Sequence, residues 1–495
     1  MITLIVLDGF GLTTKQKGNA ITKETAPHFF EMWERFPHTT LNASGEAVGL
    51  DKLQMGNSEV GHLTMGAGRV FKQDLKNIND AIKSGEFNDN KVILNAIKHC
   101  KQNNSILHLM GLVSNGGVHS HVNHLLQLIK LAKKYNVNYV IHAFTDGRDS
   151  GIMESKQFLK QVEKTGGKIV SIIGRVFAMD RENRWDRVEK AFDMLTLGKA
   201  DLYETSVQKA LKYWHNKNIT DEFLPATIIG QPQNVNSNDS VLFFNFRSDR
   251  ARELAEAFTN KSFSNFKVKN MDNLYFAGFA EYDQTQKNVN VCFPSPKIEN
   301  PLAKIIADAN LLQFHCSETT KYAHVSFFFN GGHENPFKGE DRKLIESINT
   351  QNFVDYPEMR AEEIMQEVLT AISSQKYAFI LVNFSNADII GHSGNFEQTK
   401  KAIKCVDRCA SCVALSTMLA GGEAIITADH GNAEEMLDKN GNSSTTHSCN
   451  KVPFLLFTNK LNINLKQKKG ISCVAPTILK LLNLPVPNEM DEPLF

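Results

Sequence analysis

The sequence has little cysteine, almost no net charge and no long apolar run, and each absence excludes a class of protein. Its eight cysteines are spread over 495 residues, which argues against a disulfide-stabilised scaffold. A formal net charge of +1 provides no bulk positive field to attract nucleic acid or an anionic membrane surface. No apolar stretch reaches the roughly 18 residues that a membrane span requires, so we expect no contact with a membrane interior.

The N-terminal residues do not have the pattern of a signal peptide. The first ten residues contain no basic residue, and Asp8 interrupts their short apolar run, so they make a poor signal peptide. We therefore expect a cytoplasmic protein.

The closest group of cysteines, Cys405, Cys409 and Cys412, has the spacing of one helix face, and no fourth zinc ligand lies nearby in the sequence. We expect these cysteines to pack in a core.

What the sequence does contain is an alternation of strand-like and helix-like segments. A helical pattern opens at Pro357, and another runs from about Glu397 to Leu419. Short apolar runs bounded by polar or turn residues predict buried parallel strands, and the order of strand, helix and strand predicts an α/β fold. These runs are Thr3–Leu7, Ile106–Val113, Tyr139–Phe144, Lys168–Ile173, Val241–Phe246, Tyr377–Phe384, Glu423–Thr427 and Pro453–Thr458.

A chain of this length should form more than one domain. Reactive polar residues follow strands in the first and last thirds of the chain, and ligands of open α/β sheets bind at the carboxyl ends of strands. We therefore expect the first and last thirds to form one site-bearing sheet, with the middle third inserted as a second α/β domain. The predicted segments are residues 1–73, 74–296 and 297–495, with the second boundary near Pro294-Ser295-Pro296.

Four short motifs carry candidate metal ligands. Asp388 and His392 are four residues apart, so on a helix both side chains can reach one ion. Taken singly, each motif also has an ordinary explanation, such as a helix terminus, a turn or a structural histidine. Together they supply three carboxylates and three imidazoles, which is too many for one ion and suits a two-metal site for phosphoryl transfer. The candidate ligands are Asp8, Asp388, His392, Asp429, His430 and His447.

A candidate nucleophile lies in the run Met55-Gly-Asn-Ser58-Glu-Val-Gly-His62. A helix that starts at Ser58 would direct its first N–H groups toward a phosphate on that serine. The alternative is that Ser58 is only a helix N-cap, which is a common structural role. No clear Ser-His-Asp arrangement accompanies it, so an ion would have to activate the hydroxyl.

The middle third is rich in arginine, the side chain that pairs bidentately with carboxylate and phosphate. Residues 174–187 hold four arginines, and three more lie at Arg247, Arg250 and Arg252. Solvated helix faces with salt bridges would explain each run singly, but the runs follow strands. His119 and His121 could bind a metal together, but a substrate role for His119 is preferred because two ions already have ligands.

The motifs together resemble one family. The chain is similar over its whole length to 2,3-bisphosphoglycerate-independent phosphoglycerate mutases. Ser248 and the run from Asn383 to Asp388 depart from the usual family pattern without removing a ligand. The motifs that carry the resemblance are Asp8-Gly, Met-Gly-Asn-Ser58-Glu-Val-Gly-His, His119-Ser-His, Asp-Gly-Arg148-Asp149, Asp-Arg-Glu-Asn-Arg-Trp-Asp-Arg187, Phe-Arg247-Ser-Asp-Arg250, Glu318-Thr-Thr-Lys321-Tyr-Ala-His, Asp388-Ile-Ile-Gly-His392, Thr-Ala-Asp429-His430-Gly-Asn and Thr446-His447.

This resemblance implies an alkaline-phosphatase-like parallel-sheet domain with an inserted transferase domain that binds the substrate. It implies interconversion of 3- and 2-phosphoglycerate through a phosphoserine, in glycolysis and gluconeogenesis, without 2,3-bisphosphoglycerate. The alternatives are a metal-dependent phosphatase or another phosphomutase of the same superfamily, and a non-catalytic sugar-phosphate-binding or scaffolding protein. The expected partner is therefore the small-molecule substrate, with no nucleic acid and no membrane, and we expect a monomer.

The resemblance also implies roles for individual residues. Ser58 would become the phosphoserine, and Asp149, expected to pair with the neighbouring Arg148, would be a second catalytic group. Two divalent ions are implied, most readily Mn²⁺, with Mg²⁺ as the other option. One ion would be held by Asp388, His392 and His447, and the other by Asp8, Ser58, Asp429 and His430. The implied substrate contacts are His119, Arg148, Asp149, Arg181, Arg187, Arg247, Arg250 and Lys321.

Overall fold

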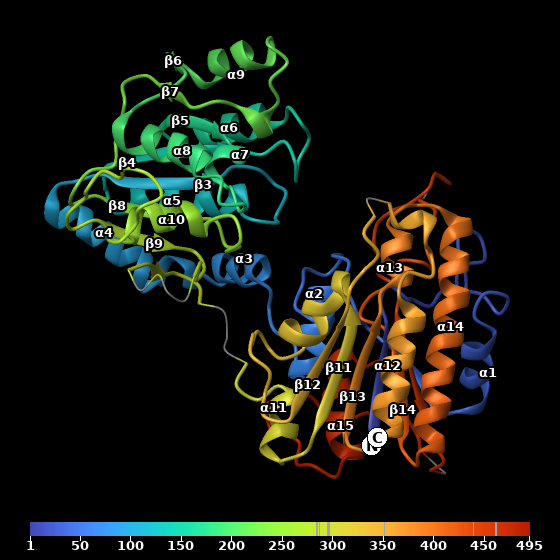
Figure 1. Ribbon diagram of the computed structural model, residues 1–495. Coiled ribbons are helices and arrows are strands. Elements are labelled where there is room, and N and C mark those ends of the chain that lie inside the picture. Colours follow the sequence, from blue (N-terminus) through green and yellow to red (C-terminus); the bar gives the residue numbers. More distant parts are fainter. Residues whose placement is uncertain (284–285, 287, 295–297, 351, 439, 461–462) are drawn as a thin grey trace. The chain divides into compact units, whose positions relative to one another are not determined.

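The computed structural model describes residues 1–495 except 284–285, 287, 295–297, 351, 439 and 461–462. The chain divides into two compact units (Figure 1). One comprises Met1–Lys72 and Pro296–Phe495, and the other comprises Gln73–Ser295. We call the first the two-segment unit and the second the inserted unit. The predicted second boundary falls in residues 295–297, which lie outside the described residues.

The two-segment unit is built on a seven-stranded sheet of the described residues, in which most neighbours run parallel. The prediction of parallel strands was wrong for the run at Pro453–Thr458, because it forms β15, which pairs antiparallel with β14 and β2. In sheet order the strands are β12 (Glu340–Ile345), β11 (Gln313–Glu318), β13 (Phe379–Phe384), β1 (Ile2–Leu7), β14 (Glu423–Thr427), β15 (Val452–Phe457) and β2 (His38–Leu41).

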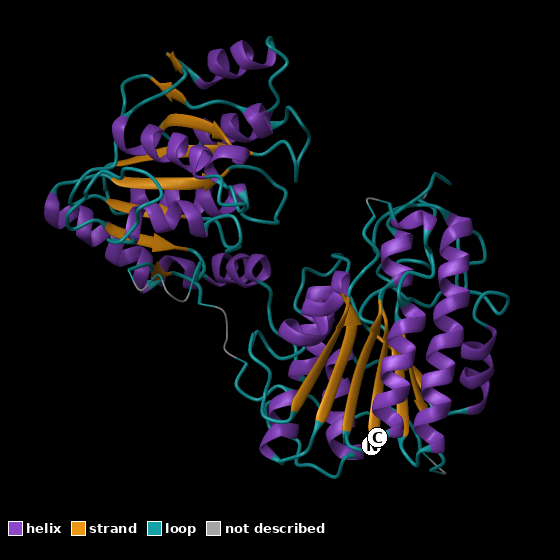
Figure 2. Cartoon of the chain, in the orientation of Figure 1, coloured by secondary structure: helices purple, strands orange, loops and turns teal. Residues whose placement is uncertain are grey.

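Helices cover both faces of this sheet (Figure 2). In Figure 1, α12 and α14 lie over the face turned toward the viewer, and α15 lies behind it. The predicted helix at 397–419 is confirmed as α14, whereas α12 begins four residues after Pro357. The helices are α1 (Pro27–Arg35), α2 (Ser58–Ala67), α11 (Leu302–Asp308), α12 (Ala361–Ser373), α13 (Asn386–Gly391), α14 (Phe396–Leu419) and α15 (Val474–Leu481).

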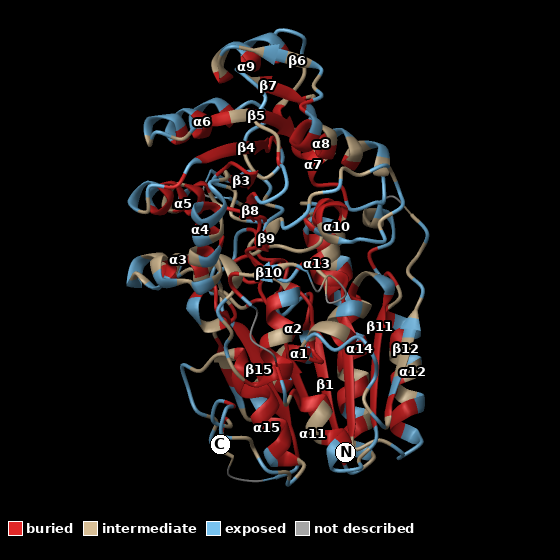
Figure 3. Ribbon diagram, turned by 90° about the vertical axis from the view of Figure 1, so that its left-hand side faces the viewer, coloured by how far each residue is buried: buried red, intermediate tan, exposed pale blue. Residues whose placement is uncertain are grey.

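The central strands are buried along their whole length, as Figure 3 shows. Every residue of β1, with the sequence ITLIVL, is buried, as is every residue of β13. A strand covered on both faces has no polar side, which is why the sequence shows continuous apolar runs rather than alternation. Cys405 and Cys409 pack in this core, as predicted, and Cys412 is half-buried.

The inserted unit has its own sheet, with the strand order β10-β9-β8-β3-β4-β5-β7-β6 among the described residues. All its neighbours run parallel except β5 and β7. The expected α/β fold with two mainly parallel sheets is therefore confirmed. The strands are β3 (Leu107–Leu112), β4 (Tyr139–Thr145), β5 (Ile169–Gly174), β6 (Leu202–Glu204), β7 (Thr227–Ile229), β8 (Ser240–Phe243), β9 (Tyr275–Gly278) and β10 (Asn290–Val291).

The helices of the inserted unit present apolar residues to two core clusters, one on each side of its sheet. Among the described residues of both units, no helix is long and apolar enough to cross a membrane. The helices of this unit are α3 (Asp74–Ser84), α4 (Lys91–Asn103), α5 (Val122–Lys134), α6 (Ser155–Lys164), α7 (Arg175–Ala178), α8 (Trp185–Leu197), α9 (Val207–His215) and α10 (Arg252–Thr259).

Candidate active site

Three buried carboxylates lie at one edge of the two-segment sheet. Asp8 directly follows β1, Asp388 lies in α13 shortly after β13, and Asp429 lies two residues after β14. Because these strands are parallel neighbours, their carboxyl ends meet at the same edge. The sheet therefore brings together residues that are up to 421 positions apart in the sequence.

Two glycines permit the close approaches that this cluster needs. Gly9 has φ +75°, and a Cβ there would lie 2.8 Å from the Cα of Asp388. A Cβ on Gly61 in α2 would lie 2.7 Å from the carbonyl oxygen of Asp429. Any side chain at either position would push the ligand-bearing segments apart.

One set of converging atoms contains Asp388, His392 and His447. The Nδ1 atom of His392 lies 2.7 Å from the Thr445 carbonyl oxygen, and that of His447 lies 2.8 Å from the Gly56 carbonyl oxygen. A carbonyl only accepts, so both imidazoles carry a proton on Nδ1 and leave Nε2 as an acceptor. The two Nε2 atoms are 3.0 Å apart, and each lies 3.2 Å from Oδ1 of Asp388.

A second set contains Asp8, Ser58, Asp429 and His430, all of them buried. The Nε2 atom of His430 lies 3.0 Å from the Ser58 hydroxyl oxygen and 3.5 Å from both Asp8 Oδ1 and Asp429 Oδ2. The hydroxyl of Ser58 donates to Asp8 Oδ1 at 3.2 Å. Asp429 Oδ2 is buried without a hydrogen-bond donor among the described residues.

This chemistry fits divalent cations. Lone pairs of carboxylates and imidazoles converge in both sets, and such atoms repel one another unless a cation or proton lies between them. Asp388, His392 and His447 form one group that could hold a metal ion, and Asp8 belongs to two others, with His62 and Asp429 and with Asp388 and His430. Carboxylates and imidazoles are donor types that suit first-row divalent metals. The two predicted ligand sets are thus each brought together in space, although Asp388 also lies 3.9 Å from His430 and so contacts both.

Lys321 supplies a fixed positive charge inside the cluster. Its Nζ lies 2.7 Å from Asp8 Oδ1, 2.7 Å from Asp388 Oδ2 and 2.5 Å from the Ser58 hydroxyl oxygen. Burial opposes a charge here, but the carboxylates of Asp8 and Asp388 outweigh it and raise the pKa of Lys321 above its ordinary value. Lys321 therefore stays an ammonium and cannot remove the proton of Ser58 near neutral pH.

Ser58 is the first residue of α2, as expected, but it is not the N-cap. Asn57 fills that role, because its side chain accepts a hydrogen bond from the backbone N–H of Val60 at 3.0 Å. The N-cap role, which would have explained Ser58 as a structural residue, therefore belongs to Asn57. The hydroxyl of Ser58 is left facing Asp8, Lys321 and His430.

In the inserted unit, Asp149 pairs with Arg175 and not with the expected Arg148. The Nη1 atom of the buried Arg175 lies 2.5 Å from Asp149 Oδ2 and 2.7 Å from Asp146 Oδ1. Arg148 instead contacts Glu222 at 3.2 Å. The glycine between Asp146 and Arg148 turns the chain, so adjacent residues point to different partners.

The Asp249 carboxylate lies close to three of the residues that are predicted to bind the substrate. Its carboxylate lies 3.6 Å from His119 Nδ1, 3.1 Å from Arg181 Nη1 and 3.3 Å from Arg247 Nε. Burial, together with the nearby Arg175, lowers the pKa of His119 to about 4, so its imidazole is neutral at pH 7. His119 can therefore donate or accept a hydrogen bond beside a group of cations.

The two other predicted arginines contact residues of one short segment. Arg187 lies 3.3 Å from Asp180 Oδ1, and Arg250 donates to the carbonyl of Met179 at 3.0 Å. Both partners belong to the segment that follows α7. The inserted unit thus presents several guanidinium groups that are oriented by acidic or carbonyl partners, as an anion-binding surface requires.

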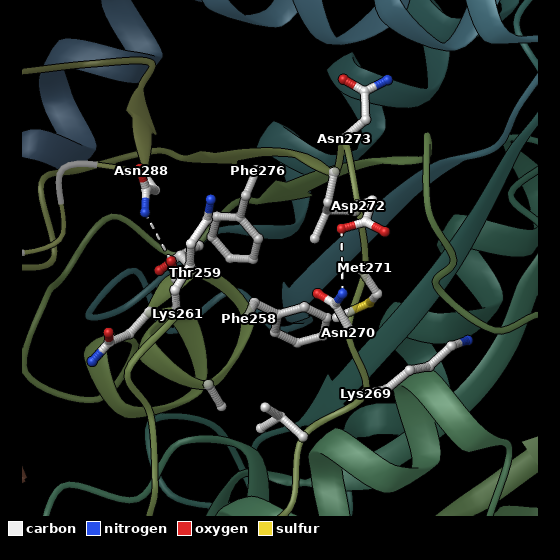
Figure 4. A pocket seen from close by; sticks show the side chains of 14 residues that line it. Phe258, Thr259, Lys261, Lys269, Asn270, Met271, Asp272, Asn273, Phe276 and Asn288 are labelled. Atoms are coloured by element: carbon white, nitrogen blue, oxygen red, sulfur yellow. Dashed lines mark hydrogen bonds between the residues drawn. The ribbon is translucent and has the colours of Figure 1, made fainter.

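A separate cavity of about 670 Å³ in this unit holds none of these residues (Figure 4). It lies between α10 and β9, beside Phe258 and Phe276. Several of its polar groups already contact protein atoms. Asn270 donates to Asp272, Asn288 donates to the carbonyl of Thr259, and Lys269 donates to the carbonyls of Thr196 and Val235.

Comparison with known proteins identifies the family. The family model for the BPG-independent PGAM N-terminus matches residues 78–284. A 2,3-bisphosphoglycerate-independent phosphoglycerate mutase of Clostridium botulinum is 44% identical over 99% of this chain and 98% of its own length. That of Antithamnion sp. is 43% identical over 99% and 97%. The chain belongs to the family of 2,3-bisphosphoglycerate-independent phosphoglycerate mutases. It is thus an isomerase that interconverts 3- and 2-phosphoglycerate.

A solved structure extends the agreement to the fold of the mutase. The crystal structure of Leishmania mexicana phosphoglycerate mutase at low cobalt concentration aligns with a TM-score of 0.75 and 30% sequence identity. The alignment covers 100% of this chain and 97% of that one. The resemblance inferred from the motifs is therefore confirmed.

In each unit, residues that contact the predicted site residues were not themselves predicted as functional. His62 and Asn383 contact the ligand sets, and Arg175, Asp146 and Asp249 organise the arginine-rich surface. His62 had a local signal, because it follows Ser58 by one helical turn. Arg175 and Asp249 lie within the arginine-rich motifs, but their partners could not be read from those motifs. Asn383 acts on partners that are distant in the sequence.

Proposed function

We propose that the mutase transfers its phosphoryl group through Ser58. The observation that carries this proposal is the position of the Ser58 hydroxyl, which contacts Asp8, Lys321 and His430 at the start of α2. The N–H groups of a helix terminus favour a phosphate at this place. No other hydroxyl among the predicted site residues has this environment.

Two divalent ions would complete the site. Asp388, His392 and His447 would hold one, and Asp8, Ser58, Asp429 and His430 would hold the other. Mn²⁺ suits the imidazole ligands better than Mg²⁺ does. When bound, such ions favour the ionised hydroxyl of the serine and offset the charge of the transferring phosphate.

The inserted unit would hold the glycerate part of the substrate. Its carboxylate and hydroxyls suit guanidinium groups and a neutral imidazole, which supports binding by the residues named below. Lys321, which belongs to the two-segment unit, would contact the phosphate as a fixed ammonium. The proposed contacts of the inserted unit are His119, Arg148, Asp149, Arg181, Arg187, Arg247 and Arg250.

The reaction would proceed in two balanced steps. First, a bond forms between Ser58 Oγ and phosphorus as the bond from phosphorus to the 3-oxygen of glycerate breaks. Ser58 releases its proton to water, and Asp149 passes a proton taken from water to the 3-oxygen. Next, Asp149 takes the proton of the 2-hydroxyl and returns it to water, and the 2-oxygen takes the phosphoryl group from Ser58, which regains a proton from water. Both side chains end as they began, and no 2,3-bisphosphoglycerate is needed.

The activity and the composition support a proposal for the location, the partners and the oligomeric state of the mutase. We propose that the mutase works as a cytoplasmic enzyme of glycolysis and gluconeogenesis. Its partner would be the small-molecule substrate, without nucleic acid or membrane. We also propose that it acts as a monomer, for which sedimentation should give a mass near 55.4 kDa.

Replacing Asp149 with asparagine tests the substrate half of this proposal. The amide keeps the shape but cannot carry the proton, so we expect the mutase rate to fall about 10²- to 10⁴-fold. A coupled assay for 2-phosphoglycerate measures the rate, and elemental analysis should find the metal content unchanged.

Asp193→Asn is the matched control, because Asp193 is also an ion-paired carboxylate of the inserted unit, 2.8 Å from Lys199. It should retain full activity. An Asp149→Asn protein that works at nearly the normal rate would place the proton-carrying role on another residue.

A further inference from the structure

A buried amide lies behind the second ligand set. Asn383, the fifth residue of β13, is fully buried. Its Nδ2 donates to Asp8 Oδ2 at 2.8 Å and lies 3.0 Å from Nε2 of His62. The reverse orientation of this amide would set its oxygen against the Asp8 carboxylate, so the two amide hydrogens must point to these two acceptors.

The imidazole of His62 continues the chain of contacts to two further ligands. It belongs to α2, one turn after Ser58, and is fully buried. Its Nδ1 lies 2.9 Å from the Ser58 carbonyl oxygen and 3.3 Å from Asp429 Oδ2. Because the carbonyl only accepts, the proton is on Nδ1, and Nε2 is free to accept from Asn383.

These contacts decide which atoms face the ion. The Asn383 amide donates to Oδ2 of Asp8, so Oδ1 is the oxygen that faces Ser58 and His430. The Nδ1–H of His62, which donates to the Ser58 carbonyl, also lies 3.3 Å from Asp429 Oδ2, and the absence of a side chain on Gly61 allows α2 to approach Asp429. With Nδ1 committed to the Ser58 carbonyl and Nε2 to the amide, His62 has no lone pair left for an ion.

We propose that Asn383 and His62 are positioning residues that orient Asp8, Ser58 and Asp429 for the second ion. This inference rests on the proposed two-ion site. Hydrogen bonds to metal ligands fix the direction of the ligand atoms, and losing them weakens metal binding about 10- to 100-fold. The first ligand set has carbonyl partners of its own, from Thr445 and Gly56, and does not depend on this chain of contacts.

Three variants test the proposal. His62→Asn keeps a donor near the Nδ1 position and loses the acceptor, His62→Gln does the reverse, and Asn383→Leu removes both amide hydrogens. Titration calorimetry with Mn²⁺ on the metal-depleted full chain measures both affinities. We expect one ion to bind as in the wild type and the other about 10- to 100-fold more weakly.

His315→Asn is the control for the loss of a buried imidazole. His315 is fully buried in the same unit, and its Nδ1 also lies 2.8 Å from a carbonyl oxygen, that of Val325. Both ions should bind this variant normally. Circular dichroism and the unfolding midpoint establish that each protein is folded, and the conservative His62 variants provide the test if Asn383→Leu does not fold.

Double variants show which ion is affected. Adding His62→Asn to Asp429→Ala should cause no further loss of metal affinity. Adding it to His392→Ala should weaken the binding of both ions. Equal weakening of both ions by the His62 and Asn383 variants, or unchanged affinities, would overturn the positioning role. A wild-type chain that binds fewer than two ions would instead contradict the proposed ligand sets themselves, and the positioning role with them.

Discussion

Ser58→Ala is expected to abolish mutase activity while leaving the chain folded. Loss of a covalent nucleophile in other enzymes lowers kcat by roughly 10⁴- to 10⁶-fold. The cost to stability should be small, because Asn57, not Ser58, caps α2. A coupled assay gives the rate, and the thermal unfolding midpoint reports the fold.

Ser374→Ala serves as the control, because this serine is exposed at the end of α12 in the same unit and makes only local hydrogen bonds, to the Ala371 carbonyl and from the Lys376 backbone N–H. It should behave as the wild type. A folded Ser58→Ala protein with substantial turnover would show that the phosphoryl group takes another route.

Removal of divalent ions should have an effect of similar size. Exhaustive chelation is expected to lower activity by at least about 10³-fold, since ions of this kind supply several kcal/mol and each 1.4 kcal/mol is a factor of ten. Lys321 cannot substitute for the ions, because one ammonium faces three carboxylates and the phosphate as well. Adding Mn²⁺ should restore the rate, and full activity in protein shown to be metal-free would contradict the two-ion site.

The same site should lose its ions on acidification. The Asp388 carboxylate raises the pKa of His392, and it also raises that of His447 against the effect of burial. Protons therefore occupy Nε2 of these imidazoles at a higher pH than the ordinary 6.5 or so, and they compete with the ion. Below the raised pKa values the apparent affinity should fall by up to about tenfold per pH unit for each imidazole.

Much of this architecture could be predicted because it depends on local patterns. Continuous apolar runs such as Thr3–Leu7 mark strands buried on both faces, and the polar residues after them mark a sheet edge. Asp388 and His392 share a face of one short helix, so their spacing alone predicted their contact.

The remainder depends on contacts that no local pattern contains. Arg175 reaches Asp149 across the ends of two strands, and Asn383 reaches His62 over 321 positions of sequence. The direction of β15 was missed because a buried antiparallel strand between two neighbours has the same apolar run as a parallel one. Such features follow from the assembled sheet and not from the sequence of one element.

The most direct test of phosphoryl transfer through Ser58 is to find the phosphoryl group on the enzyme. The chain, loaded with Mn²⁺, is mixed with 3-phosphoglycerate, quenched during turnover and digested, and its peptides are analysed by mass spectrometry. We expect a phosphopeptide that contains phosphorylated Ser58, formed no more slowly than 2-phosphoglycerate appears and absent from Ser58→Ala protein. Formation of 2-phosphoglycerate with no phosphorylated Ser58, or with the phosphoryl group on a different residue, would contradict it.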